Sequence, residues 1–267
     1  MASALSRLAR ASIRFIDIDT ATARTAETPT ATRWGLLHAF VGVAIFAAGI
    51  FLPALIPAEL MSPPLALACA FALPAAVIVW IVVVSRRWGT GNLIRDYGLR
   101  FRWIDLLGIP VAFGVIWFVQ PMVVVVALLI FGDPGGSDTN VVVSPEPLIW
   151  VPQLVLAVVL APFVEEVVFR GMLQPSLRRW FDGEWPDADR RVRATNGAVI
   201  LTSLVFCSLH LPQIVGGVNG VALGAATFFS GIVFGVHAMA TRRTAPSIVV
   251  HAAANLVAVV TAYGLMP

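Results

Sequence analysis

The sequence is poor in charged residues, which soluble enzymes need on their surfaces. Only 12% of its 267 residues are charged, whereas 58% are hydrophobic, and an ordinary soluble domain has roughly 25% charged residues. The stretch 194–241 contains no Asp, Glu, Lys or Arg. With a mean hydropathy of +0.87, the chain is excluded as a soluble enzyme and is predicted to fold in a lipid bilayer.

Lysine is absent and cysteine is scarce. All 18 basic residues are arginines, and nearly all of them lie in terminal and loop segments, with Arg170 as an exception. This distribution indicates membrane orientation and excludes a basic groove for nucleic acid. Cys69 and Cys207 lie in separate apolar stretches without CxxC spacing, which argues against a disulfide framework or a thiolate zinc site. The first 33 residues lack the apolar core of a signal peptide.

Long apolar runs are abundant, and a helix needs about 20 such residues to cross the hydrocarbon core. Their unbroken apolar character predicts helices rather than barrel strands. The expected fold is all-α, a polytopic membrane bundle of about seven transmembrane helices, or eight if the long fourth stretch is divided. The seven stretches are 34–56, 65–84, 106–131, 148–178, 195–211, 218–241 and 246–263.

Three regions follow from this pattern: a polar cytoplasmic tail at 1–33, three transmembrane helices with their loops at 34–147, and a helical core at 148–267. Arginines crowd every second connection, and arginine-rich loops face the cytoplasm. The alternation predicts a cytoplasmic N-terminus and an outside C-terminus. The arginine-only basic set and the alanine- and valine-rich spans indicate a bacterial cytoplasmic membrane.

The fourth stretch contains the most unexpected residues, because ionisable groups are costly inside a bilayer and mark functional sites there. Glu165, Glu166 and Arg170 lie in the run PFVEEVVFRG. Glu166 and Arg170 have the i, i+4 spacing of a helical ion pair. Glu165 should point elsewhere and stay free as a catalytic acid or base. The alternative is one buried network of all three residues.

Two later stretches add polar groups. The fifth ends in FCSLH with His210, and the seventh begins with His251 and Asn255, which share one helix face. With Glu165 these residues could activate water and stabilise an oxyanion, or bind a divalent metal that does so. Helical rise places Glu165 about 20 Å from its cytoplasmic end but His251 only about 8 Å from its own, which predicts that His251 lies shallower.

The runs EEVVFRG, FCSLH and HAAAN resemble the EExxxR, FxxxH and HxxxN motifs of the CPBP intramembrane proteases. This family includes the type II CAAX prenyl proteases and the bacteriocin-processing Abi proteins. The three motifs occur in the family's order on successive apolar segments, and the resemblance covers 148–267.

The resemblance implies an intramembrane endopeptidase in which Glu165 and His210 activate water. His251 and Asn255 would stabilise the oxyanion or complete a metal site, with Glu165, His210 and His251 as ligands of a divalent ion such as zinc. The motif residues Glu166, Arg170 and Phe206 would shape the site. The family resemblance leaves open whether the mechanism is that of a glutamate protease or a metalloprotease.

The expected partners are a peptide or membrane-protein substrate and the lipid bilayer, with no nucleic acid. Two other functions stay open at this point. One is a non-catalytic immunity or partner-binding protein of the same fold. The other is a small proton-coupled transporter, since intramembrane Glu and His also form proton relays; the sequence shows no internal repeat that would favour it.

Overall fold

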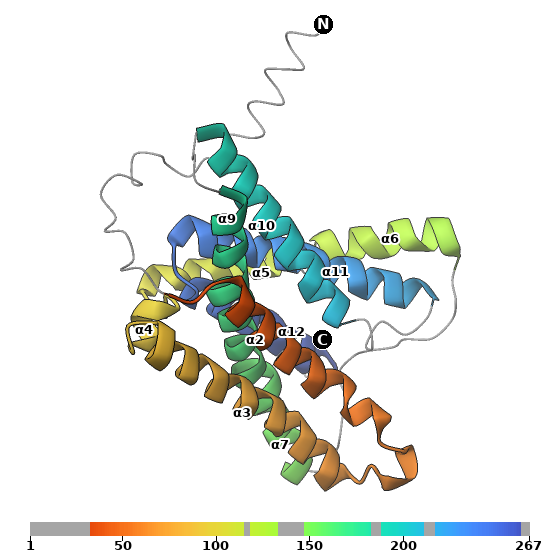
Figure 1. Cartoon of the computed structure of the whole chain (residues 1–267). Helices are drawn as coiled ribbons and strands as arrows, with labels where there is room; N and C mark the ends of the chain where they lie inside the picture. The colour runs from red at the N-terminus through yellow and green to blue at the C-terminus, as the bar shows by residue number, and fades with distance from the viewer. Residues whose placement is uncertain (1–32, 115–117, 133–146, 183–187, 211–216, 263–267) are drawn as a thin grey trace, which may run out of the picture.

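A computed structural model describes residues 33–114, 118–132, 147–182, 188–210 and 217–262. In these ranges the chain is helical and contains no strand, which confirms the all-α fold (Figure 1). The expected tail at 1–33 lies almost wholly outside the described residues. Of the seven apolar stretches, six contain one continuous helical run each.

The helices before the fourth stretch are α2 (Leu36–Phe51), α3 (Pro63–Trp88), α4 (Leu93–Asp96), α5 (Gly108–Gly114) and α6 (Gln120–Phe131), with the 3-10 turns η2 (Pro53–Leu55), η3 (Ala58–Leu60) and η4 (Trp103–Leu107). The fourth stretch is one helical run made of α7 (Pro147–Val155), η6 (Leu156–Leu160), α8 (Ala161–Glu166), η7 (Val167–Leu173) and α9 (Gln174–Asp182). The remaining helices are α10 (Ala188–Leu209), α11 (Gly217–Thr241) and α12 (Ala245–Ala262).

The third stretch is described in two parts, η4 with α5 and then α6, on either side of residues 115–117. Helix α5 packs on α12, whereas α6 packs on α11 at the edge of the bundle (Figure 1). One transmembrane helix over the whole stretch stays a prediction.

Four described helical runs are long and apolar enough to cross a membrane: 63–88, 150–182, 192–209 and 223–241. Three shorter apolar helices, Leu36–Phe51, Pro121–Ile130 and Ala245–Thr261, fall below that length. The chain is thus an integral membrane protein, and the count of seven spans stays a prediction.

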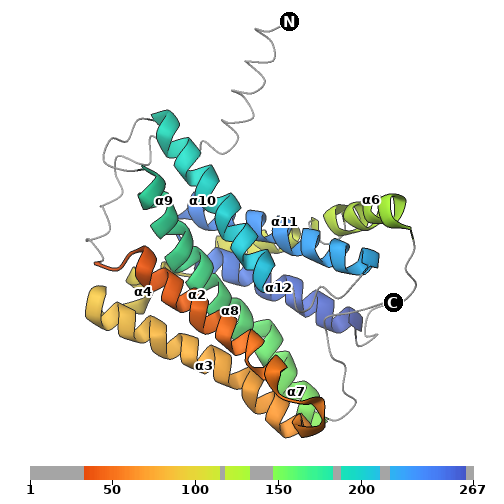
Figure 2. The ribbon, with the colours of Figure 1, turned by 45° about the vertical axis from the view of Figure 1, so that its right-hand side comes forward.

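Two packed groups of helices position the fourth stretch. Helices α2 and α3 lie beside the α7–α9 run, while α10, α11 and α12 pack against one another on its other side (Figure 2). The main core joins them through aromatic side chains. Phe169 contacts Phe46 of α2 with ring centroids 5.6 Å apart and Phe206 of α10 at 5.1 Å. The α7–α9 run is therefore surrounded at the centre of the bundle.

The segment between α4 and η4 is tied to the turn between α11 and α12. Arg243 forms a two-pronged ion pair with Asp105, with both nitrogen–oxygen distances at 2.7 Å. The Thr244 N–H donates to the Gly98 carbonyl at 2.9 Å. Burial raises the pKa of Asp105, but the bonds from Arg243 and the Arg102 backbone N–H outweigh this effect, so the net pKa is lowered. This ion pair connects the N-terminal half to the helices that carry the site.

Candidate active site

Glu165 and Glu166 lie on a short α-helical segment between two π-helical segments. Helix α8, which ends in Glu165 and Glu166, is preceded by the π-helix η6 and followed by the π-helix η7. Each π turn contains an extra residue and is frequent at functional sites. Pro162 at the start of α8 lacks an N–H and favours such a departure from α-helical bonding. The two π turns change which residues face the neighbouring helices.

Glu166 and Arg170 form the expected ion pair, at 3.1 Å between Nη1 and Oε1, with both side chains fully buried. The guanidinium also donates through Nη2 to the Gly231 carbonyl at 3.1 Å. It lies over the Phe206 ring, 4.5 Å from the centroid, a distance at which a cation and an aromatic face attract. Glu166 therefore has a dedicated cation inside the bundle.

His251 of α12 lies between the two carboxylates. Its Nδ1 is 3.0 Å from Glu166 Oε1, and its Nε2 is 3.8 Å from Glu165 Oε2. Glu165 lies outside the Glu166–Arg170 ion pair, and the two adjacent carboxylates face the two nitrogens of one imidazole. The expected difference in depth is absent, because α12 packs directly on α8.

The two glutamates differ in solvent access and in partners. Glu165 retains 10% of its side-chain surface exposed, against none for Glu166. Each carboxylate has a buried Oε2 atom without a hydrogen-bond partner among the described residues. The two residues differ at Glu166 Oε1, which binds both Arg170 and His251. The expected division of labour between one paired and one available carboxylate agrees with this geometry.

Aromatic rings fix the orientation of His251. The Phe234 ring stacks on the imidazole with centroids 4.8 Å apart and an interplanar angle of 21°. Phe206 meets the imidazole edge-on at 6.0 Å. Phe234 belongs to no motif named from the sequence, and sequence reasoning missed it. Its only signal was its place between the two small residues Gly231 and Gly235.

His210 also packs against Phe206. It occupies the turn after α10, and its Nδ1 is 2.8 Å from the Phe206 carbonyl oxygen. Its ring lies 4.6 Å from the Phe206 ring. The structure therefore brings His251, rather than His210, to Glu165, because the end of α10 turns the first ring nitrogen of His210 back to its own helix.

Asn255 shares the His251 face of α12, as its spacing predicts, but its amide meets the protein backbone. Its Nδ2 donates to the Ala157 carbonyl in η6 at 2.8 Å. We expected Asn255 to face a polar cavity together with His251, whereas the structure shows its amide bonded to a backbone carbonyl. The carbonyl is a competing acceptor that the HxxxN spacing does not reveal.

Gln174 was also missed, although it continues the i, i+4 series that begins with Glu166 and Arg170. It is fully buried and donates through Nε2 to the Gly235 carbonyl at 2.8 Å. Arg170 and Gln174 thus bind carbonyls one turn apart on α11. A Cβ atom at Gly235 would lie 2.7 Å from Gln174 Oε1. Glycine there permits the close approach that places Phe234 against His251.

The expected metal ligands do not fit an ion in this arrangement. Within the described ranges, no three His, Cys, Asp or Glu side chains are grouped so that they could hold a metal. Glu165 and His251 are adjacent, but His210 does not join them as a third ligand.

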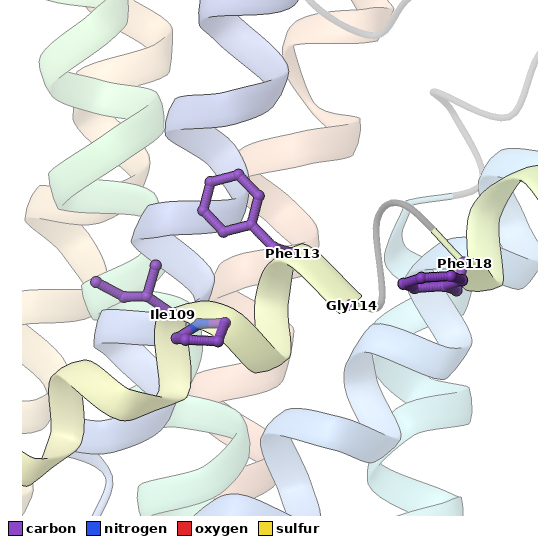
Figure 3. A pocket seen from close by; sticks show the side chains of 5 residues that line it. Ile109, Phe113, Gly114 and Phe118 are labelled. Carbon is purple, nitrogen blue, oxygen red and sulfur yellow. The ribbon is translucent and has the colours of Figure 1, made fainter.

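A pocket of about 520 Å³ lies away from these residues, at the division between α5 and α6. Figure 3 shows its apolar lining, which includes Ile109, Phe113 and Phe118. None of the expected site residues lines it, and its apolar walls offer no group for acid–base chemistry.

Comparison with known proteins supports the three motifs. The family model described as type II CAAX prenyl endopeptidase Rce1-like matches residues 147–257, which include all seven expected site residues. No curated protein and no solved structure matches the chain. The matched region, which contains the buried Glu–Arg–His cluster, is therefore similar to the CPBP/CAAX family of membrane proteases.

Proposed function

We propose that this protease hydrolyses a peptide bond of a peptide or membrane-protein substrate in or near the membrane, with Glu165 as the base that activates water. The observation that carries the proposal is the asymmetric pair of carboxylates around His251. Glu166 is fully buried and paired with Arg170, while Glu165 lies outside that ion pair and retains 10% of its side-chain surface exposed.

The carboxylate Glu165 would take a proton from water while the water oxygen attacks the scissile carbonyl carbon. The resulting tetrahedral intermediate carries a negative charge on the former carbonyl oxygen. Collapse of that intermediate breaks the carbon–nitrogen bond, and the proton held by Glu165 passes to the leaving amine. General acid–base catalysis of this kind typically contributes 10²–10⁴-fold.

His251 would support this proton transfer. Donation from Nδ1–H to Glu166 leaves Nε2 facing Glu165, and such an orienting hydrogen bond selects one tautomer. Stabilisation of the oxyanion by His251, which is its expected role, would use the imidazolium form, in which each ring nitrogen carries a proton. His210, which packs against the Phe206 ring, is the second imidazole of the proposal and is assigned to water activation with Glu165 through Nε2, since its Nδ1 is bonded to the Phe206 carbonyl.

The site should open to the cytoplasmic side of a bacterial cytoplasmic membrane, with the N-terminus inside and the C-terminus outside. The support is the alternation of arginine-rich and arginine-free connections. Water must reach Glu165 from that side, because hydrolysis consumes one water molecule per bond.

The test compares membranes from cells that produce equal amounts of wild type, Glu165→Gln, His210→Ala and His251→Ala, with peptide termini identified by mass spectrometry. Glu165→Gln keeps the side-chain size and removes the base. We expect a set of new termini in wild type that Glu165→Gln abolishes and both histidine variants reduce. Identical termini from wild type and Glu165→Gln would contradict the proposal.

A further inference from the structure

The Asn255 amide fills a gap in the backbone hydrogen bonding of the helix that carries Glu165. Asn255 lies on α12 and Ala157 in η6, 98 positions away in sequence, and the bond between them is 2.8 Å long. Both residues are half-buried. In such surroundings an unpaired carbonyl oxygen is costly, so the donor matters energetically.

The Ala157 carbonyl lacks its usual helical donors. In an α-helix it would accept from the N–H of residue 161, but the Ala161 N–H donates instead to Leu156, five residues earlier. In the widened π pattern the next donor would belong to residue 162. That residue is Pro162, which has no N–H. A side chain from outside the helix must therefore supply the donor.

The same helix α12 contacts the α7–α9 run at two points one turn apart. Asn255 binds the η6 carbonyl, and His251 lies 3.8 Å from Glu165 in α8. The segment 157–165, which joins these two contact points, contains most of the π-helix η6 and Pro162. If the carbonyl were released, η6 could return to α-helical bonding, which would rotate α8 and move Glu165 relative to His251.

We propose that Asn255 is a positioning residue: its amide replaces the backbone N–H that Pro162 lacks, keeps η6 in its π form and so holds Glu165 opposite His251. For its effect on catalysis this inference rests on the proposed function, whereas its effect on helix stability does not. One N–H of the Asn255 amide is committed to Ala157 in this assignment, and the second N–H stays available as a donor.

The test is a double-mutant cycle of Asn255→Ala and Pro162→Ala, since alanine at 162 restores an N–H beside the Ala157 carbonyl. Purified variants in lipid nanodiscs are compared by thermal unfolding and by product formation from membrane proteins, well below the unfolding temperature. Asn255→Asp, which has the same shape but cannot donate when ionised, is a second probe. Leu256→Ala, at the exposed neighbouring position, is the matched control.

We expect Asn255→Ala and Asn255→Asp to lower Tm by roughly 3–9 °C and product formation roughly ten- to a hundred-fold. Pro162→Ala should recover most of both losses in the Asn255→Ala background, and Leu256→Ala should change neither. If Asn255→Ala does not fold alone, recovery of folding by Pro162→Ala is the expected result.

Two results would overturn the inference. One is that Asn255→Ala lowers Tm and product formation by the same amount whether residue 162 is proline or alanine. The other is a loss of product with unchanged Tm that Pro162→Ala does not restore, because an amide acting on the substrate would behave in that way. If wild type forms no product, the proposed function fails, and the Tm values of the cycle still test the role of Asn255.

Discussion

Removal of the Arg170 side-chain charge should be among the most destabilising single changes in this protein. Arg170→Met keeps much of the side-chain volume but leaves the Glu166 carboxylate fully buried without its cation. It also removes the donor to the Gly231 carbonyl. Loss of one partner from a buried ion pair typically costs about 3–5 kcal/mol. For a protein of this size that corresponds to a fall in Tm of roughly 6–20 °C.

The size of this loss should depend on the charge of residue 166. In Glu166→Gln/Arg170→Met no charge is left uncompensated, and the glutamine oxygen can still accept from His251 Nδ1. We expect the double variant to regain at least half of the stability lost in Arg170→Met. Thermal unfolding in one detergent provides the measurement, and Arg87→Met, at an exposed position, is the control, with an expected change within about 0.5 kcal/mol.

The reasoning would be refuted if Arg170→Met cost less than about 1 kcal/mol. It would also be refuted if the losses of the two single variants simply added in the double variant. Either result would mean that Glu166 and Arg170 are not coupled as the 3.1 Å contact indicates.

Three further predictions concern the contacts around the site. The pKa of Asp105 is lowered in the folded protein, so its contribution to stability is complete above its unfolded pKa and disappears as the pH falls. Arg243→Gln should therefore lower Tm at pH 7. It should also make the decline of Tm between about pH 5 and pH 2 less steep. Burial and, to a smaller extent, the nearby Asp96 charge raise the pKa of Tyr97, so its contribution to stability is complete below the unfolded pKa and is lost at higher pH. We therefore expect the Tm of wild type to fall more steeply than that of Tyr97→Phe above about pH 10. Gly235→Ala should cost about 1–3 kcal/mol in unfolding measurements through contact with Gln174, and an unchanged Tm would show that α11 can move away freely.

The helical architecture could largely be predicted, because long apolar runs in a bilayer have few alternatives to helices. The Glu166–Arg170 pair could also be predicted, since i, i+4 spacing brings side chains together within a single helix. Both inferences depend on local geometry alone. The packing of α5 on α12 and of α6 on α11 could not be predicted, because it depends on contacts between segments far apart in the sequence.

The arrangement around His251 was beyond sequence reasoning for a similar reason. Two π turns alter the direction of the carboxylates, and no residue in the chain encodes a π turn by itself. Pro162 offered a partial signal, because a proline inside an apolar helix leaves a carbonyl to be satisfied elsewhere. The donor, Asn255, lies 98 residues from Ala157, and only the packing of α12 on η6 brings them together.

The most direct test of the central claim uses purified protein in lipid vesicles. Wild type and Glu165→Gln are incubated in H₂¹⁸O with membrane proteins from cells that lack the protein, and the products are sequenced by mass spectrometry. The proposed mechanism predicts new pairs of termini with wild type only, each new carboxyl terminus containing one ¹⁸O atom from water. The same labelled termini from Glu165→Gln would contradict the assignment of Glu165 as the base.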